Sequence, residues 1–165
     1  MKKLVLIQGT MGIGKSTVCE QLLQCTQRSA YLDGDWCWRM HPFVVNDENK
    51  RMVIDHITHL LRGLLQNSQV ETVYFCWVMH RQEIVDEILH ALQEVDFVPI
   101  PIALVCDAQT LAQRLRSRGE NQQAIARSVA RLPLYQALPS TKLDVSKLSV
   151  RQTAECILAH VHASA

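Results

Sequence analysis

The chain has 165 residues, of which 48% are hydrophobic and 20% charged, and its formal net charge is +1. This length suits a single domain with a buried core, which we expect to span residues 1–165. The near-neutral charge gives no reason to expect nucleic acid or an anionic membrane as a partner.

The first half of the chain alternates short apolar runs with longer stretches of helical periodicity. The continuous apolar run at residues 4–7 predicts a buried strand over residues 3–8, followed by a helix over residues 15–27. A second, short strand is predicted at residues 29–32. A long helix capped by Asn46 should then extend to about Asn67, because its apolar residues recur at helical spacing along one face.

The same alternation continues through the middle of the chain. Aromatic and β-branched residues predict a third strand at residues 72–78, and a helix follows over residues 81–95. A fourth strand is predicted at residues 100–106. Asp107 should cap a helix that ends at Arg118. The polar, arginine-bearing stretch after it, residues 119–131, is predicted to be helical in part.

Two prolines, Pro133 and Pro139, bracket a predicted turn into a short last strand at residues 142–145. Ser149 should cap the final helix. Strands separated by helices indicate βαβ units, whose right-handed crossovers give a parallel sheet covered on both faces. We therefore expect an α/β fold of three layers with five parallel strands.

Cysteine usage and the start of the chain indicate the compartment. The six cysteines contain no C-x-x-C pair and lie mostly in apolar-periodic segments, so we interpret them as reduced core thiols. The apolar run after Lys2 and Lys3 is too short for a secretory signal, and no stretch approaches the length of a membrane span. The sequence predicts a cytoplasmic protein.

The segment between the first strand and the first helix matches the pattern G-x-x-x-x-G-K-[ST] at every fixed position. Glycines let the backbone turn its N–H groups toward phosphate oxygens, and the following helix presents its positive end. The lysine should bridge the outer phosphates, and the serine hydroxyl should help to bind Mg²⁺. The predicted phosphate cradle comprises Gly9, Thr10, Met11, Gly12, Ile13, Gly14, Lys15, Ser16 and Thr17. With this loop, the predicted fold becomes a P-loop NTPase fold.

Two carboxylates, Asp33 and Asp35, follow the second strand at the edge of the sheet where ligands bind in this architecture. The third strand ends without the acidic residue typical of mechanical ATPases. The GTPase-like tetrad at residues 141–144 lies inside a predicted strand and has no accompanying D-x-x-G motif, so we interpret it as a chance match. These features favour a kinase over a motor or a GTPase.

The loop and the acidic pair resemble those of P-loop small-molecule and nucleoside monophosphate kinases, including shikimate kinase-, gluconate kinase- and chloramphenicol phosphotransferase-like proteins. The resemblance implies ATP and Mg²⁺ as cofactors. It also implies that Asp33 acts as a base or, with Ser16, organises the metal ion, and that Asp35 contacts substrate. The sequence leaves open which of the two carboxylates is the base.

Two arginines four residues apart, Arg114 and Arg118, lie on one face of the helix that leads into residues 119–131. Adenylate kinase-like enzymes have a similar pair at the entrance to a mobile lid. The resemblance implies that Arg114 stacks on adenine, that Arg118 reaches the transferred phosphoryl group, and that residues 119–131 form a short helical lid. Arg131 is a possible second phosphate contact.

An acceptor site is expected between the Asp33 loop and the long helix from Asn46. We predict substrate contacts from Asp35, Trp36, Arg39 and Arg51. His80, just after the third strand, faces the same edge and is expected to have its hydrogen bonds satisfied within its loop.

Two functions remain open from the sequence. One is an ATP-dependent phosphotransferase that acts on a small hydroxylated metabolite, a nucleotide or an antibiotic-like acceptor. The other is a nucleotide-binding regulatory protein or slow NTPase without a dedicated acceptor. The acidic pair and the spaced arginines favour the first, because a binding module needs neither.

Overall fold

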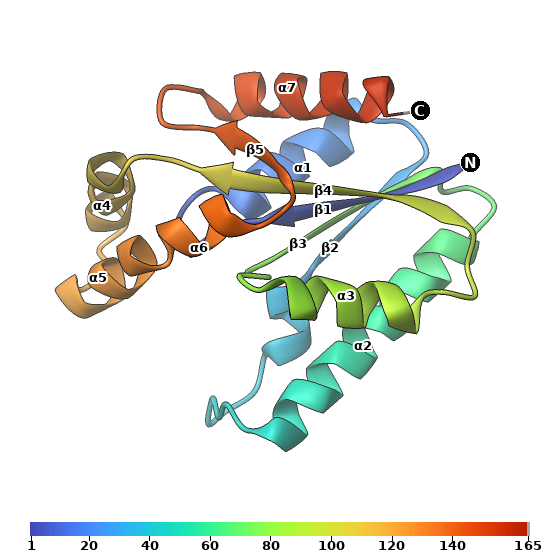
Figure 1. Ribbon diagram of the computed structural model, residues 1–165, viewed down its shortest axis with the longest axis horizontal. Coiled ribbons are helices and arrows are strands. Elements are labelled where there is room, and N and C mark those ends of the chain that lie inside the picture. Colours follow the sequence, from blue (N-terminus) through green and yellow to red (C-terminus); the bar gives the residue numbers. More distant parts are fainter. Residues whose placement is uncertain (165) are drawn as a thin grey trace.

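The computed structural model describes residues 1–164, and the described strands form one parallel five-stranded sheet (Figure 1). Its strand order is β2-β3-β1-β4-β5, so the first strand lies at the centre. The strands are β1 (Lys2–Gln8), β2 (Ser29–Asp33), β3 (Thr72–Trp77), β4 (Phe97–Val105) and β5 (Thr141–Asp144). The predicted α/β fold with a parallel sheet is confirmed.

Helices cover both faces of the sheet (Figure 1). On one face, α1 (Lys15–Cys25) and α7 (Val150–Ala163) pack together over side chains such as Val5 and Ile7. On the other face, α2 (Asp47–Gln66) and α3 (Gln82–Ala91) pack over alternating side chains such as Leu4 and Leu6. The central strand is therefore buried on both sides, which explains its uninterrupted apolar run.

Three short helices and a 3₁₀ segment lie near the carboxyl ends of the strands. They are η1 (Gly34–Trp38), α4 (Ala108–Ser117), α5 (Gln122–Ala130) and α6 (Leu132–Ala137). Ile125 of α5 and Leu115 of α4 join the core cluster under α1 and α7. The segment predicted as a lid is thus a helix packed against the domain.

Three helix starts have the caps expected from the sequence, and a fourth has a cap that was not predicted. Asn46, Asp107 and Ser149 each accept a hydrogen bond from the backbone N–H three residues ahead, at 2.8, 2.7 and 3.2 Å. Ser149 and Gln152 form a complete capping box. Asn121 caps α5 in the same way, at 2.9 Å from Ala124 N. These caps satisfy backbone donors that a helix leaves unpaired at its first turn.

Several predicted boundaries are wrong, including the end of the helix predicted over residues 81–95, which stops at Ala91. Residues 133–139 were expected to be a turn, but Pro133 occupies the first turn of α6, where a missing N–H removes no helical hydrogen bond. The fourth strand begins at Phe97 rather than Ile100 and includes Pro99 and Pro101. Pairing with β5 starts only at Ile102, so these prolines lie where the outer side of β4 has no described strand beside it.

Some side chains are more exposed than their periodicity predicts. Leu60 is one of the helically spaced apolar residues of α2, but its side chain is 45% exposed. Cys19 and Cys76 are buried, whereas Cys25 and Cys156 are exposed. All six cysteines are free thiols, as expected, although only some of them belong to the core.

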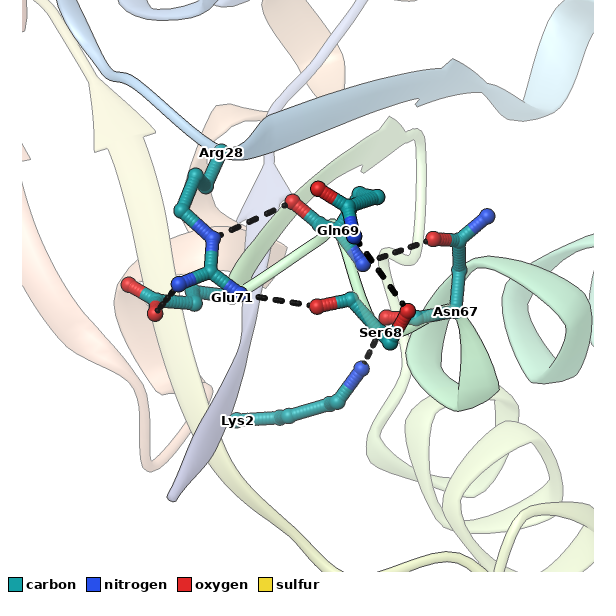
Figure 2. A network of polar contacts seen from close by, with 6 residues as sticks. All are labelled: Lys2, Arg28, Asn67, Ser68, Gln69 and Glu71. Atoms are coloured by element: carbon teal, nitrogen blue, oxygen red, sulfur yellow. Dashed lines mark hydrogen bonds and ion pairs between the residues drawn. The ribbon is translucent and has the colours of Figure 1, made fainter.

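A polar network closes the amino-terminal edge of the sheet, opposite the carboxyl ends (Figure 2). Arg28 forms an ion pair with Glu71 at 2.6 Å and donates to the carbonyl of Ser68 at 2.7 Å. Lys2 donates to the carbonyl of Asn67 in the same turn. The network joins the starts of β1, β2 and β3 and lies away from the strand ends where a ligand would bind.

Among the described residues, no helix combines the length and apolar character needed to cross a bilayer.

Candidate active site

The loop between β1 and α1 takes the backbone shape that a phosphate cradle needs. Gly12 has a φ of 83°, and a Cβ atom there would lie 2.2 Å from Leu115 Cδ2, so only glycine fits. Gly14, with a φ of 109°, precedes the first turn of α1. Within the described chain, that turn has no side-chain cap and no acidic residue. Its N–H groups and the positive end of the helix dipole are therefore left for an anion.

Lys15 is the first residue of α1, and its Nζ donates back to the Thr10 carbonyl of the loop at 3.1 Å. Desolvation lowers the pKa of its ammonium group, against the opposing influence of Cys76 and the two aspartates. A cation held in this partly desolvated position gains most from an anionic ligand, because phosphate charge would replace the lost hydration. This is the environment expected of a phosphate-binding lysine.

Not every side chain of the predicted cradle faces the ligand. Thr10 is buried and donates to the carbonyl of Ser128 on α5 at 2.8 Å, and Ile13 is buried in the core. Only the backbone of Thr10 and Ile13 is therefore left to contact a phosphate. The Thr10 hydrogen bond has a different consequence, since it fastens α5 to the phosphate loop.

Asp33 at the end of β2 lies directly beside the loop. Ser16 Oγ donates to Asp33 Oδ2 at 2.6 Å, and the Tyr31 hydroxyl donates to the same oxygen at 3.0 Å. The second oxygen, Oδ1, accepts from the Asp35 N–H at 2.9 Å. Asp33 is only 5% exposed. Both of its oxygens are thus engaged, and the side chain is fixed against Ser16.

The donor set formed by Ser16 and Asp33 suits a magnesium ion. Both provide hard oxygen atoms, and magnesium in phosphate sites is held by one or two carboxylates together with phosphate oxygens. Among residues 1–164 there is no cluster of three His, Cys, Asp or Glu side chains that could hold a metal without such help. The residues present therefore fit a metal ion that arrives with a nucleotide.

Asp35 has different surroundings from Asp33. It is exposed and lines a cavity of about 800 Å³ that also contains Lys15 and Ser16. Desolvation, and then the charge of Asp33, raise the pKa of its carboxyl, while Lys15 and Trp77 oppose the rise. Gly34 allows this placement, because a Cβ there would lie 2.4 Å from Trp77 Cγ.

The cavity extends from the phosphate loop to the segment before α2, a volume within the range of small-molecule sites. Three arginines line the cavity from the side of α4 and α5. They are Arg118 after α4, and Arg127 and Arg131 at the end of α5. The motif-based prediction had missed Arg127. Its spacing of four residues from Arg131, at the end of a short helix, was the available signal, since it places both on one face.

Arg114 is directed elsewhere. Its guanidinium donates to the Val145 carbonyl at 2.8 Å, in the loop after β5. Among the described residues that line the large cavity, Arg118 is present and Arg114 is not. The two arginines predicted as a pair therefore lie in separate surroundings, and Arg114 borders the β5–α7 loop.

The structure does not bring the other predicted substrate contacts together. Trp36 packs edge-on against Tyr31, with ring centroids 5.0 Å apart, and with Arg39 lines a second cavity beside α2. Arg51 lines neither of these two cavities. Their sequence neighbours Trp38 and Lys50 line the large cavity instead.

His80 lines the large cavity but is not the satisfied histidine that was expected. Its Nδ1 atom is buried without a hydrogen-bond partner among residues 1–164. Desolvation and the nearby charges of Arg131 and Arg81 lower its pKa. The preceding Met79 has a φ of 33°, rare for a residue with a side chain, and its carbonyl accepts from Gln8 at 3.3 Å. A strained, buried turn thus holds the His80 imidazole at the cavity.

A parallel sheet in the order β2-β3-β1-β4-β5, with a phosphate loop between β1 and α1, defines the P-loop class of nucleotide-binding proteins. Within that class, the chain belongs to the family described as AAA domain, whose model matches residues 5–132. A comparison with curated proteins finds no match.

Solved structures with the same fold include several small-molecule kinases. A tunicamycin resistance protein from Deinococcus radiodurans has a TM-score of 0.77 at 18% identity, covering 98% of this chain and 96% of that one. A gluconokinase from Sinorhizobium meliloti 1021 has a TM-score of 0.69 at 16% identity, with 96% and 93% covered. A shikimate kinase from Acinetobacter baumannii, in complex with shikimate, has a TM-score of 0.67 at 18% identity, with 99% and 94% covered. The chain has the P-loop kinase fold.

Proposed function

We propose that this protein is an ATP-dependent kinase that transfers a phosphoryl group to the hydroxyl of a small molecule. The observation that carries the proposal is a single cavity lined by both Lys15 and Asp35, with Asp33 fixed against Ser16 beside it. The cavity thus joins a phosphate-binding loop to a carboxylate with raised pKa. A protein that only binds nucleotide needs the loop but not the carboxylate.

The donor half of the site binds and neutralises phosphate. The loop N–H groups and Lys15 hold the nucleotide phosphates, and Arg118, Arg127 and Arg131 approach from the lid side of the same cavity. A magnesium ion bound through Ser16 and Asp33 would supply further charge neutralisation. Phosphoryl transfer depends mainly on such positioning and charge, because the transition state spreads negative charge over the transferred oxygens.

The acceptor half assigns different roles to the two aspartates. Asp33 uses both oxygens in hydrogen bonds, so we assign it the metal-organising role. Asp35 is open to the cavity, and we assign it the role of base. As the acceptor oxygen bonds to the terminal phosphorus, the hydroxyl proton moves to the Asp35 carboxylate. The bond from that phosphorus to the bridging oxygen breaks, and ADP leaves with the electron pair.

The function can be tested by following ADP release over a panel of hydroxylated acceptors, together with product analysis. At least one acceptor should raise ADP release above basal hydrolysis and appear as a phosphorylated product. Lys15→Ala should lower this rate by about 100-fold or more, because a phosphate-stabilising cation is lost. Lys2→Ala, at the far edge of the sheet, is the matched control and should retain the rate. If no acceptor raises ADP release while nucleotide still binds, the chain is a binding protein or slow NTPase instead.

A further inference from the structure

The part of the large cavity away from the phosphate loop has a mainly apolar wall. Its apolar lining comes from η1, the segment after it, α2, β3 and α3. The side chains are Trp38, Phe43, Val45, Ile54, Trp77 and Ile84. Five separate segments therefore contribute apolar surface to the same space, beside Asp35.

Two of these side chains are unusually exposed for their type. Phe43 is 65% and Val45 is 58% exposed, although both line the cavity. Phe43 also packs against Trp38, with ring centroids 5.5 Å apart and planes inclined by 45°. Exposed apolar surface facing a concave site is stabilised when a ligand with its own apolar surface covers it.

Charge is unevenly distributed in the cavity. The cations Lys15, Arg118, Arg127 and Arg131 come from the phosphate loop and from the ends of α4 and α5. The charged groups near the apolar wall are of mixed sign, since Glu87 accompanies Lys50 and Arg81. Lys50 Nζ also lies 3.6 Å from Asp47 Oδ1. The α2 and α3 side therefore carries less positive charge than the phosphate side, and it would hold a highly anionic acceptor less strongly.

From this arrangement we infer the class of acceptor: an amphiphilic alcohol, whose hydroxyl is attached to an aromatic or branched aliphatic body. The inference rests on the proposed function for its hydroxyl, which Asp35 would deprotonate. For the aromatic or aliphatic body of the acceptor, the inference rests on the apolar wall, where this body would pack against Phe43 and Trp38. Polyols and sugar acids would leave this wall exposed or place polar groups against it.

The first test compares two acceptor sets in the transfer assay. Benzyl alcohol, tyrosol and cyclohexylmethanol represent amphiphilic alcohols, and glycerol, glucose and gluconate represent polyols and sugar acids. The amphiphilic set should give kcat/KM values at least about tenfold higher, a factor that corresponds to burial of a few apolar groups. Higher values for the polyols or gluconate would overturn the inference and leave the proposed kinase activity standing.

The second test measures binding without transfer. Trp38 and Trp77 line the cavity, so an aromatic alcohol should change the intrinsic tryptophan fluorescence in a saturable way. Phe43→Ser should weaken binding of tyrosol by about tenfold. Val44→Ser is the matched control, because Val44 is a neighbouring exposed residue outside the described lining of the cavity, and it should bind as the native protein does.

The two tests separate the possible failures. Saturable binding that depends on Phe43, with no phosphoryl transfer to any acceptor, would support the apolar ligand class and remove the kinase function. Equal binding by Phe43→Ser and the native protein, or no binding of any amphiphilic alcohol, would overturn the inference whatever the transfer assay shows. Because Phe43 is exposed, its replacement leaves the buried core intact, and thermal unfolding of the variant checks this.

Discussion

Asp33 and Asp35 are separated by one residue, yet they differ in burial and in hydrogen bonding. Asp33 is enclosed by Ser16, Tyr31 and the Asp35 backbone. The Asp35 carboxyl lines the cavity, and its pKa is raised by desolvation and by the charge of Asp33. At the residue scale, this difference is the reason why the proposed function assigns the metal ion to Asp33 and the acceptor's proton to Asp35.

Asp35→Asn should lower kcat by about 100-fold or more, the usual contribution of a general base. A base works when deprotonated, so the native rate should fall as pH decreases through the Asp35 pKa. Because that pKa is raised, the fall should occur at a higher pH than for an ordinary carboxyl group. A pH–rate profile of the native protein and the variant measures both effects.

Two comparisons give the pH experiment its controls. Asp96→Asn removes an exposed carboxylate outside the described lining of the cavity and should leave the profile unchanged. Asp33→Asn should retain nucleotide binding but raise the magnesium concentration needed for turnover. An Asp35→Asn variant that keeps both the native rate and the acid limb would show that Asp35 is not the base.

At the scale of elements, α5 is the helix that connects the phosphate loop to Arg127 and Arg131. Thr10 of the loop donates to its Ser128 carbonyl, and Ile125 anchors it in the core. Arg127 and Arg131 then extend from its end into the cavity. The position of both guanidinium groups is therefore set by a helix that is fastened to the nucleotide site.

Arg127→Ala should lower kcat about tenfold to 100-fold with a smaller change in the affinity for nucleotide, because arginines of this kind act mainly on charge that develops during transfer. Arg116→Ala is the matched control, since Arg116 is exposed on α4 outside the described lining of the cavity. Steady-state kinetics compares the two. Equal rates in both variants would remove Arg127 from the site.

On the scale of the whole molecule, the two edges of the sheet have separate tasks. The carboxyl edge carries the phosphate loop, the acidic pair and the arginines. The amino edge carries the Arg28–Glu71 pair and its hydrogen bonds, which join the starts of three strands (Figure 2). Stability and ligand binding should therefore respond to different substitutions.

Arg28→Ala should lower the free energy of unfolding by about 1 kcal/mol, because an exposed ion pair and its accompanying hydrogen bonds are each worth little. The corresponding fall in Tm is about 2–4 °C for a chain of this size. The increase in Tm on adding ATP and magnesium should stay as in the native protein. Lys15→Ala should show the converse, a nearly native Tm without the nucleotide-induced increase. Thermal unfolding with and without nucleotide reads all four values, and a lost nucleotide response in Arg28→Ala would contradict the separation.

The sequence by itself determined the sheet, the phosphate loop and most helix starts. These features depend on residues that are close in the sequence. An apolar run makes a buried strand, and glycines at fixed spacing shape the loop. A helix is capped by a side chain that accepts from the backbone N–H three residues later. Asn46, Asp107 and Ser149 were predicted as caps for that reason, and all three are confirmed. The strand containing Pro99 and Pro101 began earlier than predicted because its tolerance of proline depends on where β5 starts, which is a tertiary fact.

Only the tertiary structure decided which polar side chains share a cavity. The sequence offers no reason to separate Trp36 from Trp38. In the structure, η1 places Trp38 in the large cavity and Trp36 in the second cavity beside α2. Arg114 and Arg118 are four residues apart, a spacing that predicts one helix face, but Arg114 donates a hydrogen bond to the Val145 carbonyl instead. The division of roles between Asp33 and Asp35 likewise depends on contacts with Ser16 and Tyr31. Local patterns fix which way the backbone runs, whereas the surroundings of a side chain come from segments far away in the chain.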